Sequence, residues 1–356
     1  MKKLIILTVL LGSLNTSAQK VENIIIVTTD GLRWQEVFGG VDSSLLHNAK
    51  YTQNPEGLYK KFGNENPKVS REMLLPFFWS KVASEGSIFG NRNFGANANI
   101  KNQYGFSYPG YNEILTGYPD DTVDSNDKKY NKNLTVLEYL NQKPAFKGKI
   151  AAFGTWDVFP YIINDQRSQI PVNAGQMPQK APLNETQALL NDILKMVPSH
   201  ASDRNDFVTY FMAREYLKKE QPKVLYIAFD ETDEFAHEGN YGQYLHAAHN
   251  FDTFLKDLWD YVESNPKYKG KTALVLSTDH GRGDVNKDQW TSHGQKVPDC
   301  NQIWMAYMGP NLKNLGEIKT ETQVYQNQIA ATVAKILGEN FKPKTETGLP
   351  IVQIFK

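Results

Sequence analysis

The sequence predicts an α/β protein in which a central, mostly parallel sheet is sandwiched by helices, with loop insertions. Short, nearly continuous runs of apolar and β-branched residues recur along the chain, and amphipathic helical patterns lie between them. Runs that are apolar at every position are typical of strands buried on both faces, as in parallel sheets covered by helices. The alternation of the two kinds of segment favours one layered α/β unit.

Five runs are expected to be strands: 24–27, 224–229, 273–277, 303–308 and the segment "GKIAAFG" around Ile150. The longest helical pattern is "YGQYLHAAHNFDTFLKDLWDYVES", in which apolar residues recur at helical spacing and form one stripe that faces the core. The segments "ETQALLNDILKMV" and "DFVTYFMAREYLKKE" show the same pattern, and "VYQNQIAATVAKILG" predicts a late helix that ends at Gly338.

The first 18 residues have the order of regions found in a secretory signal peptide. Lys2 and Lys3 precede an apolar run at 4–11, and the segment closes on the small residues Thr16, Ser17 and Ala18. A buried first strand or helix is the alternative. The apolar run is too short to anchor the chain in a membrane. The expectation is therefore an exported protein, periplasmic or secreted, whose residues 19–356 form a single domain with insertions near 46–69, 120–132 and 165–183.

The composition excludes several kinds of partner and of stabilisation. Lys plus Arg and Asp plus Glu both number 39, so the formal net charge is zero and no nucleic-acid surface or anionic-membrane surface is indicated. Cys300 is the only cysteine, so an internal disulfide is excluded. Any bound metal must be held by other residue types.

Acidic residues and histidines follow three of the expected strands. The stretch "IIIVTTDG" delivers Asp30, "VLYIAFDETDEFAH" delivers Asp233 and His237, and "ALVLSTDHG" delivers Asp279 and His280, while "WTSHG" adds His293. In an open α/β sheet, ligands bind beyond the carboxyl ends of the strands, so these side chains are expected to converge. Mixed carboxylates and imidazoles suit Zn²⁺ or a similar transition metal. They are too many for one tetrahedral ion, so two divalent ions are expected, with Mn²⁺, Fe or Ca²⁺ as alternatives to zinc in one position.

The remaining histidines are expected not to be ligands. His47 and His200 are interpreted as surface residues, and His246 and His249 fall on the long helix after the acidic loop, where lining the site is the alternative.

The segment "SYPGYNEILTGYP" begins with Ser107, ahead of a short helix-like run. Ser107 has two interpretations, a simple helix cap and a nucleophile. Metal coordination is one of the accepted ways to activate a serine hydroxyl, so the ligands found elsewhere in the chain favour the nucleophile.

Taken in order, these motifs resemble the alkaline phosphatase superfamily, and within it the type I phosphodiesterase/nucleotide pyrophosphatase branch. The resemblance spans roughly residues 22–340 and rests on "TTDGLRW", "SYPGYNEILTGYP", "ETDEFAH" and "STDHG". It implies that one metal is held by Asp233, His237 and His293. It implies that the other is held by Asp30, Asp279, His280 and Ser107, with a covalent phosphoseryl intermediate on Ser107.

The sequence departs from the family pattern at several positions. The family segment Pro-Asn-His is Pro-Gly-Tyr here, at Pro109, Gly110 and Tyr111. Asn126 is the nearest match to the family asparagine that holds a phosphoryl oxygen. The Lys-x-Arg of phosphate-monoester members is absent, and the region holds aromatic residues instead, among them Trp156 and Tyr161 as candidate substrate contacts or as core. Tyr111 also stands where a sulfatase would need arginine.

The leading hypothesis is therefore an exported two-metal phosphoesterase whose substrate is a small-molecule phosphate ester. The bond hydrolysed is expected to be a phosphodiester or a nucleotide pyrophosphate-type bond. A phosphomonoesterase or a phosphonate hydrolase on the same site is the alternative, and a non-catalytic binding protein of this fold is a third. Substrate identity and oligomeric state stay open at the level of sequence.

Overall fold

The structure is a computed structural model that describes residues 20–197 and 203–356. The expected signal peptide at 1–18 lies outside the described residues, as does His200. In the described part of the chain, no helix combines the length and the apolar character that crossing a membrane would require.

Strands and helices alternate along the chain. The main sheet contains β1 (Asn23–Thr29), β2 (Gly86–Phe89), β4 (Ile150–Gly154), β5 (Val172–Ala174), β6 (Val224–Phe229), β7 (Thr272–Thr278), β8 (Met305–Met308) and β9 (Gly316–Glu317), and a second small sheet pairs β3 (Ala96–Asn99) with β10 (Thr322–Tyr325). The α-helices are α1 (Trp34–Gly39), α2 (Ser43–Leu46), α3 (Pro55–Phe62), α4 (Pro67–Leu74), α5 (Ala83–Glu85), α6 (Ser107–Thr116), α7 (Val136–Asn141), α8 (Phe159–Ile163), α9 (Asp165–Ser168), α10 (Glu185–Met196), α11 (Asp206–Glu220), α12 (Glu231–His237), α13 (Tyr241–Ser264) and α14 (Ile329–Ile336). Shorter turns of 3₁₀ or π type are η1 (Phe78–Val82), η2 (Arg92–Phe94), η3 (Lys287–Thr291), η4 (Gln326–Gln328) and η5 (Val352–Ile354).

The eight-stranded sheet has the order β5-β4-β6-β1-β7-β8-β2-β9. The predicted mostly parallel sheet is confirmed, because every neighbouring pair is parallel except the two pairs that β8 makes with β7 and β2. The predicted strand at 303–308 is shortened to Met305–Met308 and runs against its neighbours. The segment between β7 and β8 contains only the short turn η3, so the chain returns along β7 without the helical crossover that a parallel neighbour needs.

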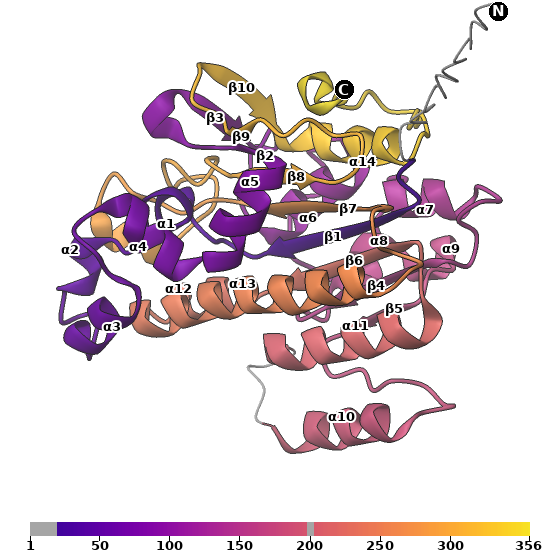
Figure 1. Ribbon diagram of the computed structural model, residues 1–356, viewed down its shortest axis with the longest axis horizontal. Helices are drawn as coiled ribbons and strands as arrows, with labels where there is room; N and C mark the ends of the chain where they lie inside the picture. Colours follow the sequence, from indigo (N-terminus) through magenta and orange to yellow (C-terminus); the bar gives the residue numbers. More distant parts are fainter. Residues whose placement is uncertain (1–19, 198–202) are drawn as a thin grey trace, which may run out of the picture.

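Helices cover both faces of the sheet, as the apolar runs predict. Ile24 and Ile26 of β1 point into a core formed with α6, α7, α8 and α14, whereas Ile25 and Val27 point into the opposite core, with α3, α4, α11 and α13. Figure 1 shows α13 and α11 on one side of β1 and α14 on the other. The 24 residues of α13 and the 15 of α11 match the predicted segments, and the late helix ends at Ile336, shortly before Gly338 (φ 79°).

The three segments expected as insertions differ in content. The segment 46–69 contains α3 and the start of α4, and its Leu58 and Phe62 are buried in the core, so it is not only a surface excursion. The segment 165–183 contributes α9 and the edge strand β5. The segment 120–132 contains neither helix nor strand and lies against the beginning of α6. Loops of this last kind are free to carry functional side chains.

Candidate metal centre

The strand register places three aspartates side by side at the carboxyl edge of the sheet. Thr29, the last residue of β1, is paired with the last residue of β6 and with the last residue of β7. The residues that follow the three strands are Asp30, Asp230 and Asp279. The expected convergence of carboxylates at the carboxyl edge of the sheet is therefore a direct consequence of parallel pairing.

The first group of converging ligand atoms comes from Asp30, Asp279 and His280, and we call it the β1–β7 set. The Nε2 atom of His280 lies 3.1 Å from Asp30 Oδ1 and 3.4 Å from Asp279 Oδ2. All three side chains are buried, and these same three atoms make no hydrogen bond within the described structure. Buried polar atoms without partners are costly, and a divalent cation would satisfy all three at once. Two carboxylates and one imidazole are donors that zinc and similar ions accept, so the residues fit the metal.

The second group comes from α12 and from the loop after η3, and we call it the α12 set. Asp233 and His237 are four residues apart on α12, so both lie on one face of the helix, and Asp233 Oδ2 is 3.0 Å from His237 Nε2. His237 Nε2 in turn lies 2.9 Å from Nε2 of His293. The sequence assigned these three residues to one metal, and the structure brings their ligand atoms together.

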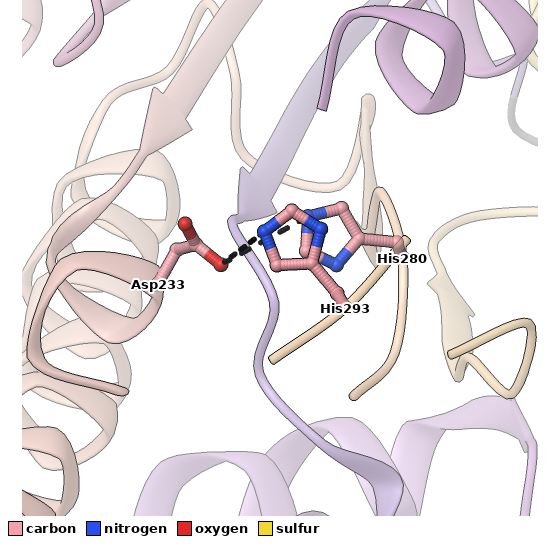
Figure 2. A group of neighbouring side chains, drawn as sticks. All are labelled: Asp233, His280 and His293. Atoms are coloured by element: carbon pink, nitrogen blue, oxygen red, sulfur yellow. Dashed lines mark ion pairs between the residues drawn. The ribbon is translucent and has the colours of Figure 1, made fainter. Parts of the chain in front are cut away.

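The two sets are adjacent, and His280 borders both. Asp233 Oδ1 lies 3.6 Å from His293 Nε2 and 3.9 Å from His280 Nε2, the two ion pairs that Figure 2 marks. The rings of the two histidines stack with centroids 4.0 Å apart, and Figure 2 shows both rings edge-on to the Asp233 carboxylate. Asp233, His280 and His293 therefore form a third, overlapping group of atoms that could hold an ion. The residues therefore form two neighbouring candidate metal positions, and His280 lies between them.

Arg282 is a site residue that the sequence analysis did not single out. Its guanidinium is fully buried, and Nη1 donates to Asp233 Oδ1. Nε lies 2.6 Å from the carbonyl oxygen of Trp290 and Nη2 lies 2.8 Å from that of Thr291, while Nη2 is also 3.5 Å from His237 Nδ1. Arg282 thus links one ligand to the segment that carries His293. The available signal was its place in "DHGRGD", two residues after His280.

Gly31 makes room for this guanidinium. A Cβ atom at Gly31 would lie 2.8 Å from Arg282 Nη1 and 2.8 Å from Asp233 Oδ1, and the residue has φ 59°. Only glycine combines the left-handed backbone with this close approach.

Burial and mutual repulsion raise the pKa values of the carboxyls in the β1–β7 set. The pKa of Asp30 is raised by burial first and then by the negative charge of Asp233, and that of Asp279 is raised by burial and then by the charge of Asp30. Asp233 behaves in the opposite way. Burial alone would raise its pKa, but Arg282 and then His293 hold the pKa well below its usual range. The two carboxylates of the β1–β7 set therefore have only the His280 imidazole beside them, whereas Asp233 of the α12 set is compensated by the permanent charge of Arg282.

The two stacked histidines have pKa values shifted in opposite directions. Burial lowers the pKa of His280, but Asp279 and Asp30 outweigh this and raise it to about 9. Burial and the neighbouring His280 charge lower the pKa of His293 well below its usual value. His293 is therefore neutral and ready to act as a ligand. A metal ion at the β1–β7 set must displace a proton from His280.

Ser107 is the first residue of α6 and is buried. Tyr111 follows it by one helical turn, so the two side chains lie on the same face of α6. The Tyr111 hydroxyl donates to Asp30 Oδ2 over 3.0 Å. The face of α6 that carries Ser107 is therefore turned toward the β1–β7 set.

Asn126 lies at the beginning of α6, although it belongs to the loop 120–132. Its Oδ1 accepts a hydrogen bond of 3.0 Å from the backbone N–H of Tyr108. Because the oxygen faces this donor, the amide nitrogen is left to donate elsewhere. Pro109 has no N–H, so α6 presents fewer free backbone donors than its position suggests.

Two glycines, Gly110 in α6 and Gly105 ahead of it, allow close contacts within the protein. A Cβ atom on Gly110 would lie 2.5 Å from the carbonyl oxygen of Asp279, so α6 packs directly against the end of β7. A Cβ atom on Gly105 would lie 2.5 Å from Cys300 Sγ. The Gly105 carbonyl also lies 3.2 Å from His293 Nδ1, which leaves Nε2 of that histidine facing His237.

The candidate substrate contacts Trp156 and Tyr161 are half-buried at the edge of one core. Trp156 packs edge-on against Phe159, and Tyr161 packs against Tyr130 of the loop 120–132. The described contacts of both rings are packing contacts, and none of them joins a metal ligand.

A separate cluster that consists of carboxylates alone lies beside the site. Asp203, Asp230 and Glu234 bring carboxylate oxygens within 4.8 Å of one another, and all three side chains are half-buried. This cluster was not predicted from the sequence, although Asp230 follows β6 as Asp30 follows β1. The other described histidines are used elsewhere: the ring of His249 lies 2.8 Å from the Leu74 carbonyl oxygen, His246 lies 3.3 Å from Lys61, and His47 lies close to Ser43.

Comparisons with known proteins identify the family. The family model described as type I phosphodiesterase / nucleotide pyrophosphatase matches residues 55–349, a range that contains all the candidate ligands except Asp30. No curated protein matches the sequence.

Several solved structures share the fold. The chain is similar to wild-type alkaline phosphatase PafA, with a TM-score of 0.61 and 12% identity over 95% of this chain and 99% of that one. It is also similar to the lipoteichoic acid synthase LtaP from Listeria monocytogenes (TM-score 0.58, 14% identity, 95% and 77% covered) and to the 2-O GAG sulfatase BT1596 (TM-score 0.56, 14% identity, 94% and 74% covered). At these identities the likeness establishes the fold alone, an alkaline phosphatase-like α/β fold.

Proposed function

The chain belongs to the type I phosphodiesterase / nucleotide pyrophosphatase family, and on that premise we propose that it is a metal-dependent hydrolase of phosphodiester or nucleotide pyrophosphate-type bonds. The observation that carries the proposal is the β1–β7 set. Three buried ligand atoms there have no hydrogen-bond partner, and the helix that carries Ser107 is turned toward them. The nearest described contacts of these atoms, at 3.1 Å and 3.4 Å, are with one another, as expected of atoms that converge on one ion.

In the proposed reaction, Ser107 Oγ attacks phosphorus, the new P–O bond forms, and the bond to the leaving alcohol or phosphate breaks. Water then hydrolyses the phosphoseryl intermediate and regenerates the serine. Two divalent ions, for which the ligand types favour zinc, would activate the hydroxyl, neutralise charge on the transferring group and stabilise the leaving oxygen. Asn126 Nδ2 donates to a phosphoryl oxygen, since Oδ1 is held by the Tyr108 N–H. The positive end of the α6 dipole favours the same anion.

The charges around the site favour a diester. A phosphate monoester carries one more negative charge and needs an extra cation beside the nucleophile. The three donor nitrogens of Arg282 are already committed to Asp233 and to two backbone carbonyls. We assign Trp156 and Tyr161 to the organic group of the substrate, because an aromatic face can pack on it.

One observation favours a phosphomonoesterase as the second candidate. Lys128 stands two residues after Asn126 on the same loop, and its Nζ lies 2.5 Å from Asp157 Oδ2. If substrate binding releases this surface pair, the ammonium becomes available for a second phosphoryl charge. Such exposed pairs contribute little to stability, so the release costs about 0–1 kcal/mol.

We also propose that the protein acts outside the cytoplasm. The support is the order of basic, apolar and small residues in 1–18.

The direct test compares initial rates on bis-p-nitrophenyl phosphate and p-nitrophenyl phosphate for zinc-loaded protein, before and after chelation. A faster, chelator-sensitive rate on the diester supports the proposal. A faster rate on the monoester supports the Lys128 candidate. No rate on either substrate with two ions bound contradicts both and favours a phosphonate substrate or a binding role.

The nucleophile is tested by Ser107→Ala, which should abolish turnover and leave one or two ions bound. Ser87→Ala is the matched control. Ser87 lies on β2, a strand that carries no candidate ligand, and its buried hydroxyl donates to the backbone carbonyl of Lys313 over 2.9 Å. Unchanged activity in Ser107→Ala contradicts the assignment.

A further inference from the structure

Tyr111 contacts a proposed metal ligand without being a ligand itself. Its hydroxyl donates to Asp30 Oδ2 over 3.0 Å, while Asp30 Oδ1 makes no hydrogen bond and lies 3.1 Å from Nε2 of His280. The two oxygens of one carboxylate are therefore in different situations. One is occupied by a protein donor, and the other faces the remaining ligand atoms of the β1–β7 set.

The position of the Tyr111 hydroxyl is fixed by packing. The ring is 1% exposed and meets Phe159 edge-on at a centroid distance of 4.8 Å. The preceding residue, Gly110, brings the backbone of α6 against the Asp279 carbonyl. The hydroxyl therefore has little freedom to leave Asp30, and α6 is held both at the Asp30 carboxylate and at the backbone carbonyl of Asp279.

We propose that Tyr111 is a positioning residue that holds Asp30 as a one-oxygen ligand of the β1–β7 ion and fixes the helix of the nucleophile to that ion. This inference rests on the proposed function and deepens it. The hydroxyl leaves Oδ1 alone to face the ion, and Ser107, one turn earlier on the same helix face, is placed by the same contact.

Loss of the hydroxyl frees the Asp30 carboxylate to rotate. Both oxygens can then approach the ion, and α6 loses one of its connections to the site. Partners that orient ligands in this way typically change metal affinity or activity by about 10–100-fold. A small displacement of the nucleophile lowers kcat more than it changes KM, because substrate binding does not depend on the attack geometry.

The test is Tyr111→Phe, which keeps the ring and removes one atom. Tyr226→Phe is the matched control. It removes a hydroxyl from the same core, 3.0 Å from Thr28 Oγ1, on a fully buried residue whose described hydrogen bond goes to Thr28 and not to a ligand. Zinc content is measured by mass spectrometry after equilibration at graded free-zinc concentrations, and Co²⁺-substituted proteins are compared by visible absorption.

The expected result is that Tyr111→Phe loses one of its two ions at a free-zinc concentration about 10–100-fold above that for wild type, with a changed Co²⁺ spectrum and a lower kcat. Tyr226→Phe should bind zinc as wild type does. Equal zinc affinities and spectra in Tyr111→Phe and wild type overturn the inference, because a hydroxyl with only a structural role would change the melting temperature alone. Failure of the proposed function is distinguishable, since wild type itself would then bind no zinc or hydrolyse no phosphate ester.

Discussion

The Nε2 atoms of His237 and His293 lie 2.9 Å apart, although one histidine ends α12 and the other lies in the loop after η3. Both side chains also approach Asp233, at 3.0 Å and 3.6 Å. Two imidazole nitrogens at this distance either share one proton or share an ion. The presence of a carboxylate beside both favours the ion.

We expect His293→Ala to reduce bound zinc from two ions per chain to one and to lower the hydrolysis rate by more than about 100-fold. The reason is that loss of a direct ligand should exceed the 10–100-fold effect of losing a ligand's partner. Zinc is counted by mass spectrometry. His249→Ala is the control, because its Nδ1 contacts the Leu74 carbonyl, away from the site. Two ions retained in His293→Ala would refute its role.

Arg282→Met should lower the free energy of unfolding by about 3–5 kcal/mol, because it leaves the Asp233 carboxylate and two backbone carbonyls without their donor. We also expect faster hydrogen exchange at 287–293 and weaker zinc binding. Arg71→Met is the control, since it breaks another buried pair, 2.7 Å from Glu317, far along the sheet at β9. It should destabilise the protein with no change in zinc affinity. Equal effects of the two variants on zinc binding would leave Arg282 without a role at the site.

Gly110→Ala should impair the enzyme through backbone displacement. The new Cβ would stand 2.5 Å from the Asp279 carbonyl oxygen, so α6 must move away from β7. We expect a fall in kcat of at least about 100-fold, the cost associated with a displacement of roughly 1 Å at a reacting group. Gly39→Ala, where the new Cβ meets no atom within 4 Å, should have normal activity. Wild-type kcat in Gly110→Ala would show that the contact is unimportant.

Glu113 connects α6 to the loop that precedes Ser107 and should make stability depend on pH. Its carboxylate accepts hydrogen bonds from the backbone of Lys101 and from the backbone and side chain of Asn102, whose Oδ1 accepts from Gly105. Burial raises the pKa of Glu113 from 4.5 to about 7, although the hydrogen bonds lower it in part. The raised pKa in the folded state means that its stabilisation is complete below pH 4.5 and is lost as the pH rises through 7.

Glu113→Gln removes this titration. Relative to the glutamine variant, wild type should lose about 3 kcal/mol of unfolding free energy between pH 4.5 and pH 7, since each pKa unit corresponds to about 1.4 kcal/mol. Urea unfolding at several pH values, with chelator present, measures the difference. Parallel pH profiles for the two proteins would contradict the raised pKa.

The positions of most core elements could be predicted from local sequence. The apolar residues of α13 recur at helical spacing, and those of β6 form a continuous run. Each pattern indicates which side chains are buried, and it can be recognised without the rest of the chain. The convergence of the candidate ligands could be predicted for a related reason. Asp30 and Asp279 follow strands that read as buried and parallel, and parallel strands bring their carboxyl ends to one edge.

Other features depended on contacts that no local pattern records. The reversal of β8, the edge strand β5 and the packing of α3 depend on which neighbour a segment meets. Arg282 reads as one more charged residue in a loop, and Tyr111 reads as one more aromatic residue on a helix. Their roles arise from single contacts with Asp233 and Asp30, across 49 and 81 residues of chain.

The sequence by itself determined the layered α/β architecture, the chemical types of the ligands and the candidate nucleophile, because burial periodicity and strand ends are properties of short segments. The tertiary structure alone decided which oxygen of each carboxylate is free. It also decided that His280 borders both sets and that α6 lies directly against β7. These are outcomes of close packing between distant segments, where a difference of about 1 Å determines whether a contact exists.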